Sequence, residues 1–349
     1  MAYTTIDNPE LYFQTKLYTG NGSTNAITLD GSENMQPDWV WCKVRSQSDN
    51  HAIFDSVRGG QKQLRSNSNS AELTRTNAIS SFNSDGFTMG GQPEMNTNGQ
   101  TYVAWNWKAG GSASSNSNGS ITSSVSASTT AGFSIVSYTG TGSNATVGHG
   151  LGVAPTMMII KNRDDTDSWY VWQQNLGAVA SNYINLNTTG AKSSVSDGIT
   201  ALSSSTFSLG NRGDVNASSE KYIAYCFADV QGYSKFGSYV GNGSNNGTFV
   251  YTAFKTSFVL LKNTGISENW SMHDLKRNEN VSPNYARLVP DDSQVEATNT
   301  TFAKLQTFSN GFKLGNSADV INDSGVEFIY MAFAENPFTS SAGTPVTAR

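Results

Sequence analysis

The sequence of 349 residues is poor in charge and in long hydrophobic runs, and each shortage excludes a class of protein. Only 14% of the residues are charged, and the 22 Lys and Arg are scattered and outnumbered by 27 acidic residues. Without a basic patch we expect no nucleic acid as a partner. No apolar run approaches the roughly 18 residues that a membrane-spanning helix needs, so we expect no membrane insertion. The first residues also lack the pattern of a secretory signal.

Histidine and cysteine are scarce as well. The three histidines, His51, His149 and His273, stand at unrelated places, so we expect no zinc site. Cys42 and Cys226 cannot make a disulfide framework, and both lie in apolar stretches. We therefore expect two free thiols in a core and synthesis in a reducing compartment. Nothing in the composition indicates a cofactor.

Asn, Ser, Thr and Gly are abundant, and aromatic residues reach 11% beside a hydrophobic fraction of 37%. β-branched and aromatic residues favour strands, whereas Asn, Gly and Ser favour turns. Short apolar segments recur at intervals of roughly 8 to 15 residues with little helical period, as in sandwiches and jelly rolls. The sequence therefore predicts an all-β fold.

One short string occurs three times: YTGNGS at 18–23, YTGTGS at 138–143 and YVGNGS at 239–244. A phosphate-binding loop would need a following helix and a further glycine or a Gly-Lys-Ser/Thr ending, and neither is present. The string is therefore predicted to be a turn between the first and second strands of a repeated unit.

Other landmarks recur in the same order. An apolar strand ends at a lysine in each copy, and twelve residues later stands a polar residue that closes an aromatic strand. The lysines are Lys43, Lys161 and Lys262, and the polar residues are Asp55, Gln173 and Asp274. A Phe-x-Met/Leu-Gly segment follows, and then an asparagine six residues before the closing strand: Asn96, Asn216 and Asn322. This order and spacing predict a triplication.

The repeats divide the chain into three tandem β-sandwich modules, at 11–109, 119–231 and 232–338. The Gly/Ser/Asn-rich segment 110–118 is predicted to be a flexible linker, whereas the second and third modules abut. Residues 1–10 form an N-terminal arm and residues 339–349 a C-terminal tail. Recurrent aromatic residues inside the modules are predicted to be core, since burial of one large ring stabilises by about 2–3 kcal/mol.

Two acidic positions have an arginine three residues later, Asp55 with Arg58 and Asp274 with Arg277. We interpret both as structural ion pairs that hold a loop. The second module departs from this pattern, with Gln173 and no arginine. A catalytic triad of His51, Asp55 and Ser56 is not expected, because Ser56 lacks the context of a nucleophile and the third module has leucine there.

Other acidic clusters are predicted to be solvated turns. Asp164-Asp165-Thr166-Asp167 and Asp291-Asp292 could offer carboxylates to Ca²⁺, which requires six to eight oxygen ligands. No recurring acidic pair indicates glycoside cleavage. A loop aromatic could stack on a sugar, and the candidates are Trp169 and Asn269-Trp270, although packing in the core is the favoured alternative.

Several strings resemble a repeat that is abundant in phages of marine bacteria, and the resemblance covers nearly the whole chain. They are FDSVRG at 54–59, SDGFTMGG at 84–91, YVAWNWKAGG at 102–111, VGHGLGVAP at 147–155, GYSKFGSYVGNGS at 232–244 and MAFAENPF at 331–338. Members of that group are virion structural proteins, often of the tail fibre or tail tip, with lectin-like sandwich domains. The resemblance implies the same class here, and a homotrimer as in fibres, but assigns no reaction or ligand to any residue.

We therefore expect a non-enzymatic protein of the virion surface, in the tail fibre or tail tip, that contacts host polysaccharide through many weak copies. Tyr3, Ile6 and Tyr12, in the first dozen residues, are the candidate contacts with other virion proteins. Two alternatives stay open: a head-decorating protein or capsid fibre, and a carbohydrate-active enzyme of the virion.

Overall fold

Antiparallel β-structure accounts for nearly all regular structure in the computed structural model, which describes residues 3–278, 286–298 and 303–346. The predicted all-β class is confirmed. The α-helices of the described residues are single turns, one per repeat: α1 (Pro93–Asn96), α2 (Gly213–Asn216) and α3 (Asp319–Asn322). Short 3-10 helices are η1 (Pro9–Leu11), η2 (Gln174–Leu176) and η3 (Lys276–Asn278).

Repeat 1 (residues 11–109) contains a four-stranded and a three-stranded sheet. The larger sheet has the order β1 (Phe13–Thr19), β9 (Thr101–Trp107), β3 (Trp39–Val44), β4 (Ala52–Asp55). The smaller has the order β2 (Asn25–Ile27), β8 (Gly86–Met89), β7 (Ile79–Asn83). A two-stranded sheet joins β5 (Lys62–Gln63) and β6 (Leu73–Thr74).

Repeat 2 (residues 119–231) has the same core of strands with additions at both edges. Its larger sheet has the order β10 (Ser114–Asn116), β11 (Ser123–Ser128), β12 (Phe133–Thr139), β20 (Lys221–Phe227), β14 (Met157–Asn162), β15 (Tyr170–Gln173), β16 (Asn182–Asn185), β17 (Ser193–Ser194). The smaller sheet has the order β13 (Ala145–Gly148), β19 (Thr206–Leu209), β18 (Ile199–Leu202).

The segment 110–118 was predicted to be a flexible linker, and this is wrong for the conformation in the structure, because it contains β10. The backbone N–H groups of Ala109 and Gly111 donate to the Asp38 carboxylate at 2.8 and 3.0 Å, and that of Gly110 donates to Ser126 Oγ at 3.0 Å. These bonds fix the segment against both repeats that it connects.

Repeat 3 (residues 232–338) returns to the simpler arrangement. Its larger sheet has the order β21 (Ser234–Val240), β27 (Glu327–Pro337), β23 (Phe254–Asn263), β24 (Ser271–Asp274). The smaller sheet has the order β22 (Phe249–Tyr251), β26 (Gly311–Leu314), β25 (Leu305–Phe308). The landmarks of the sequence therefore fall on equivalent strands in all three repeats.

The larger sheets are buried on both faces. In β3, Val40 and Cys42 point to the core that the two sheets of repeat 1 share, while Trp39 and Trp41 point the other way. This second face packs into a central core to which all three repeats contribute, including six of the seven tryptophans of the chain. Burial on both faces explains why these strands read as continuous apolar runs.

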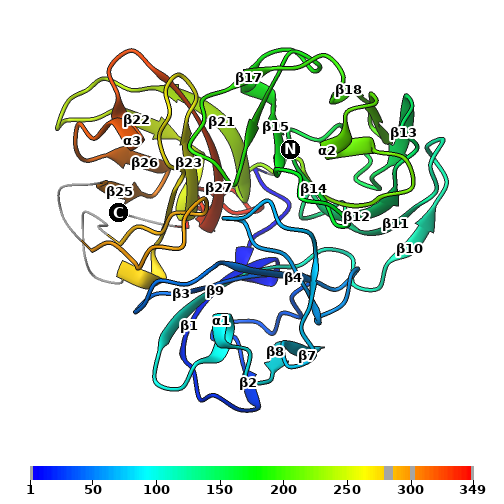
Figure 1. Ribbon diagram of the computed structural model, residues 1–349. Helices are drawn as coiled ribbons and strands as arrows, with labels where there is room; N and C mark the ends of the chain where they lie inside the picture. Colours follow the sequence, from blue (N-terminus) through cyan, green and yellow to red (C-terminus); the bar gives the residue numbers. More distant parts are fainter. Residues whose placement is uncertain (1–2, 279–285, 299–302, 347–349) are drawn as a thin grey trace.

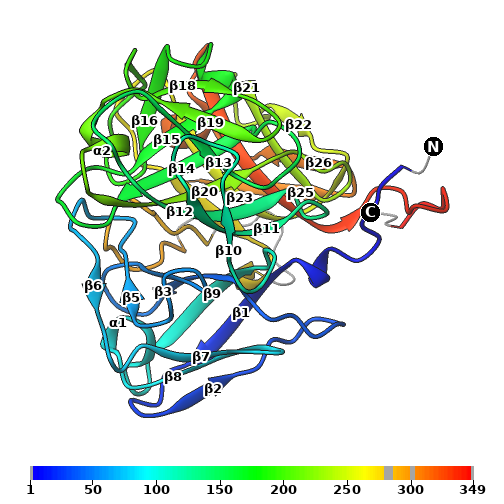
Figure 2. The same cartoon turned by 90° about the vertical axis from the view of Figure 1, so that its right-hand side faces the viewer.

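The three repeats surround this central core as three lobes of a ring (Figure 1). Repeat 1 is blue to cyan, repeat 2 green and repeat 3 yellow to red, and the larger sheet of each lobe faces the centre. The modules are consequently parts of one body and not a row of separate sandwiches. In the perpendicular view, the described N- and C-terminal segments lie together at one end of the ring axis (Figure 2). There, Ser341 N donates to Asp7 Oδ1 at 2.6 Å.

Candidate functional site

The recurrent asparagine fixes the turn between the first and second strands. In repeat 3 the Asn322 amide donates to Asn242 Oδ1, Ser244 O and Asn316 O at 2.9–3.0 Å, and its own oxygen accepts from Asn242 N. Asn96 makes the four equivalent bonds, and Asn216 makes three of them because Thr141 stands in place of Asn242. All three asparagines are fully buried. The repeated Gly-x-Gly string is a turn, as predicted.

Both glycines of the string are required by the backbone. At the first, Gly140, a Cβ would lie 2.2 Å from Ala217 O, and Gly20 and Gly241 show the same approach. The second, Gly142, has a φ of +69°, which L-residues rarely adopt. The string therefore serves backbone geometry in every repeat.

The two predicted ion pairs form and lie between repeats. Arg58 Nε donates to Asp55 Oδ2 at 2.6 Å, and both side chains are fully buried. The carboxylate also accepts from the hydroxyl of Tyr225, in repeat 2, at 2.8 Å. Desolvation opposes the charge on Arg58, but Asp55, Tyr225 and Glu72 together raise the pKa of the guanidinium. The pair joins repeat 1 to repeat 2.

The second pair joins repeat 3 to repeat 1 in the same way. Arg277 Nε donates to Asp274 Oδ2 at 2.5 Å, and the carboxylate accepts from Trp105 Nε1 at 2.9 Å. Trp105 occupies the place in β9 that Tyr225 occupies in β20. Each acidic side chain thus meets a donor on the closing strand of the next repeat.

The exception in repeat 2 follows from its neighbour. The place of Trp105 and Tyr225 is taken in repeat 3 by Met331, whose side chain carries no N–H or O–H. A buried aspartate at position 173 of repeat 2 would therefore find no side-chain hydrogen-bond donor at Met331 of repeat 3. Repeat 2 has Gln173 at this position, and its Nε2 donates to Gly237 O of repeat 3 at 3.2 Å. The three contacts run from repeat 1 to 2, from 2 to 3 and from 3 to 1, and close the ring.

Trp169 and Trp270, the candidate sugar platforms, are 0% and 1% exposed, so neither ring can stack on a glycan and that prediction is wrong. Each indole instead bridges to the preceding repeat: Trp169 Nε1 donates to Arg65 O at 2.8 Å, and Trp270 Nε1 to Asn185 O at 2.9 Å. His51, at the matching place in repeat 1, lies 2.9 Å from Val289 O of repeat 3. Packing, the alternative interpretation, is what the structure shows.

Asn269, the third sugar candidate, is half-buried and also engaged. Its Nδ2 donates to Asp291 Oδ2 at 2.9 Å, and Trp270 N donates to the other oxygen of that carboxylate at 3.0 Å. Burial raises the pKa of Asp291 to about 6. The Asp291 carboxylate therefore holds the loop at Asn269 and Trp270 by hydrogen bonds, whereas the sequence had predicted a solvated turn.

An equivalent backbone hydrogen bond joins neighbouring repeats at each of the three junctions, which we call seams. Glu72 N donates to Arg163 O, Lys192 N to Thr264 O and Glu296 N to Arg45 O, at 2.8 to 3.1 Å. At two seams the glutamate also joins two arginines: Glu72 contacts Arg58 and Arg163, and Glu296 contacts Arg277 and Arg45. Sequence reasoning missed these glutamates, because they have no fixed distance from the landmarks of the repeat.

The candidate contacts with other virion proteins, Tyr3, Ile6 and Tyr12, all pack on this chain in the structure. Ile6 is 3% exposed in the central core, and Tyr12 packs edge-on against Tyr233 with ring centroids 6.0 Å apart. Tyr3 Oη donates to Ala253 O of repeat 3 at 2.9 Å. Ile6 therefore belongs to the central core, and Tyr12 packs against it.

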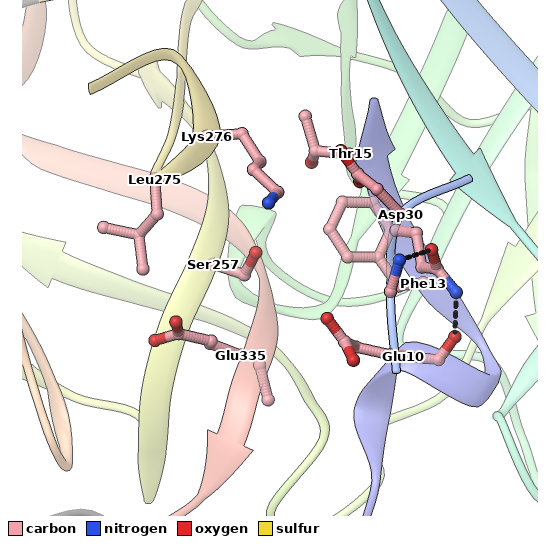
Figure 3. Close-up of a pocket in the computed structure, with 11 residues that line it drawn as sticks. Glu10, Phe13, Thr15, Asp30, Ser257, Leu275, Lys276 and Glu335 are labelled. Carbon is pink, nitrogen blue, oxygen red and sulfur yellow. Dashed lines mark hydrogen bonds between the residues drawn. The ribbon is translucent and has the colours of Figure 1, made fainter. Parts of the chain in front are cut away.

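A small pocket lies at the seam between repeats 3 and 1 (Figure 3). Its volume is about 110 Å³, below the roughly 300–1,000 Å³ of small-molecule sites. The carboxylates of Glu10 and Glu335 flank it, but the first accepts from Ser32 and the second pairs with Lys255. Figure 3 shows the Lys276 side chain extending toward Thr15 and Phe13. We assign no chemistry to this pocket.

Among residues 3–278, 286–298 and 303–346, no group of three or more His, Cys, Asp or Glu side chains could hold a metal ion. In the same ranges no helix is long and apolar enough to cross a membrane. Cys42 and Cys226 are buried free thiols, as predicted, and burial raises the pKa of each to about 12.

Comparison with known proteins gives a family but no activity. No curated protein matches the chain. A family model described as a domain of unknown function, DUF7483, matches residues 8–337. The match runs from the start of repeat 1 to the end of repeat 3 and includes the segment that connects repeats 1 and 2. The chain therefore belongs to the DUF7483 family, whose domain comprises the whole ring of three repeats.

Proposed function

We propose that this protein is a non-enzymatic structural component of a bacteriophage particle, displayed on the virion surface in the tail fibre or tail tip, where it contacts host polysaccharide. The sequence resemblance to phage virion proteins supplies the class. The closed ring is the structural observation that supports it, since its buried side chains serve the junctions between repeats.

The position of the chain ends also favours attachment by one end. The described terminal segments lie together at one end of the ring axis and are joined by the bonds of Ser341 to Asp7. Attachment at that end would leave the opposite end and the sides of the ring accessible to a host surface. A fibre or tail tip requires this polarity.

We retain the homotrimer as a proposal, but burial of the inner faces of the sheets is no reason for it. The chain places three larger sheets around one core by itself, so no second copy is needed to bury their inner faces. Trimerisation would use the outer surface of the ring. One copy could equally match a partner that has threefold symmetry, and mass photometry of the purified protein would give the stoichiometry.

Cryo-electron microscopy of the intact particle tests the proposal. We expect density of this ring at the tail fibre or tail tip. Density on capsid faces or vertices would favour the head-decorating alternative, and absence from purified particles would refute a virion role. Release of reducing sugar from host polysaccharide by the purified protein would favour an enzyme.

A further inference from the structure

The exposed aromatic rings of the described residues gather in repeat 3. Phe249 is 43% exposed, Tyr251 50% and Phe308 37%. Phe249 and Phe308 meet edge to face with centroids 5.8 Å apart, and the Lys235 ammonium lies 5.7 Å from the centroid of Tyr251. Three neighbouring rings that stay exposed to water do not contribute the stability that their burial would give. A cluster of this kind therefore indicates a binding surface.

Two of these rings border a cleft of about 380 Å³ between repeats 2 and 3. One wall is formed by the edge strands β21 and β22 of repeat 3, and the other includes Gln174 and Asn175 of repeat 2. The volume lies within the roughly 300–1,000 Å³ typical of sites for small ligands.

The floor of the cleft differs from the matching places of repeats 1 and 2. Gly237 of β21 lies opposite Tyr330 of β27. The same register holds Lys16 opposite Ala104 in repeat 1 and Val136 opposite Ala224 in repeat 2. In repeat 3 the large side chain of this pair therefore lies on β27 and not on the edge strand β21. A Cβ on Gly237 would lie 2.6 Å from the Tyr330 hydroxyl oxygen, so glycine is needed for the ring to lie there.

Tyr330 brings a hydroxyl group to this floor. Its side chain lines the cleft and is only 3% exposed. The hydroxyl makes no hydrogen bond to another described residue, and its oxygen is not fully enclosed by protein. It is therefore available to a ligand that enters the cleft, in place of water.

The rings of the cleft are also particular to repeat 3. Phe249 pairs with Lys313 of β26, and the equivalent positions are Ala26 in repeat 1 and Thr146 in repeat 2. Tyr251 corresponds in the same way to Thr28 and Gly148. The scaffold therefore does not require aromatic residues at either position.

The open edge of β21 is protected against an added strand. Its Phe236 N–H donates to the Asp229 carboxylate at 3.0 Å, and Phe236 O accepts from Gln174 Nε2 at 2.7 Å. Such capping disfavours recognition by main-chain pairing. Binding in the cleft must then rest on side chains.

We propose that this cleft binds a short stretch of a neutral polysaccharide. Aromatic faces accept the C–H face of a sugar ring, and the Tyr330 hydroxyl with Asn175, Gln174 and Ser238 offers hydrogen bonds to sugar hydroxyls. The charges of Lys235 and Asp229 balance, which matches an uncharged ligand. The inference names the site of the glycan contact in the proposed function and rests on that function.

The test uses the purified full-length chain and a panel of neutral oligosaccharides of glucose, galactose, mannose and N-acetylhexosamines, read by calorimetry and saturation-transfer NMR. We expect affinity near the millimolar range for at least one saccharide. Y330F should weaken binding about tenfold, because one buried hydrogen bond is lost. The double variant G237V/Y330A, which recreates the pair Val136 and Ala224 of repeat 2, should remove the hydroxyl, reshape the floor of the cleft and abolish binding while the chain stays folded.

The variant F249A/Y251T, which carries the residues of repeat 1, should also abolish binding, and I266S is the control, since Ile266 is 40% exposed outside the cleft. Binding of no saccharide, or unchanged binding by G237V/Y330A, would overturn the inference. Self-association lost in F249A/Y251T without sugar binding would identify a protein interface instead. Because the purified chain is used, these results are independent of where the protein lies on a particle.

Discussion

Single residues in this protein act at the junctions between repeats. The buried Asp55–Arg58 and Asp274–Arg277 pairs each take a hydrogen bond from the next repeat, and the choice of Gln173 in repeat 2 follows from the absence of a donor at Met331. A buried ion pair contributes little net stability by itself, but removal of one partner leaves an uncompensated charge. These residues therefore determine how repeats join more than how each repeat folds.

D55A should destabilise the protein by about 3–5 kcal/mol, because Arg58 keeps its charge in a buried site without its nearest carboxylate. Chemical denaturation followed by tryptophan fluorescence measures the effect. D30A is the control: the ion pair of Asp30 with Lys16 is exposed, so its loss should change stability by less than about 1 kcal/mol. Equal effects of the two substitutions would contradict this account.

The three equivalent lysines predict a dependence of stability on pH. Burial lowers the pKa of Lys43, Lys161 and Lys262 from 10.5 to about 8. Their folded pKa lies below the unfolded value, so the unfolded chain binds more protons between these values and stability rises with pH. We expect the free energy of unfolding to increase from pH 8 toward pH 10, by at most about 3 kcal/mol per lysine. A flat or falling profile across that interval would show that the ammonium groups are compensated.

At the scale of elements, each repeat is defined by its turns and by strands that are apolar on both faces. The short recurring apolar segments predicted the strands, and the shared spacing identified their equivalents. The Gly-x-Gly turn and the recurrent asparagine lock the first strand to the single-turn helix that precedes the closing strand. A substitution at the first glycine of the turn therefore tests how closely the turn must approach the helix.

G140A should destabilise the protein by about 2–3 kcal/mol, since its Cβ would lie 2.2 Å from a backbone oxygen that cannot move without the helix. G213A is a matched control in repeat 2: no heavy atom lies within 4 Å of a Cβ there, and alanine in place of glycine favours the first turn of α2. Thermal unfolding of both variants gives the comparison. A melting temperature of G140A equal to that of G213A would refute the steric argument.

At the scale of the whole molecule, the ring is held by a central core and by seam contacts that run in one direction around it. Large rings from all lobes meet there; for example, Trp39 of repeat 1 stacks on Tyr225 of repeat 2 with centroids 4.6 Å apart. The arm adds Ile6 to this core, so deletion of residues 2–10 should lower stability and not merely remove a docking segment.

A single repeat should not persist as a folded monomer. Repeat 2 alone, residues 119–231, would expose the inner face of its larger sheet, including Phe133, Tyr225 and Phe227. Exposure of each such ring forgoes about 2–3 kcal/mol, which exceeds what a domain of this size can spare. Light scattering and dye binding should show aggregation or a loosely packed state, whereas the full chain should be monodisperse. A monomeric, cooperatively folding repeat would contradict a shared core.

The sequence by itself determined the all-β class, the triplication, the turns and the two ion pairs, because short-range spacing and residue type encode strands, turns and contacts three residues apart. It also showed a continuous apolar strand before each of the three lysines. It could not show what covers the second face, since burial by another sheet, another copy or a ligand leaves the same local pattern. Only the tertiary structure decided that the repeats cover one another, that Trp169 and Trp270 face a neighbouring repeat and that Ile6 joins the core. The cleft of repeat 3 likewise arises from residues distant in the chain, such as Gly237 and Tyr330, whose meeting depends on the strand register.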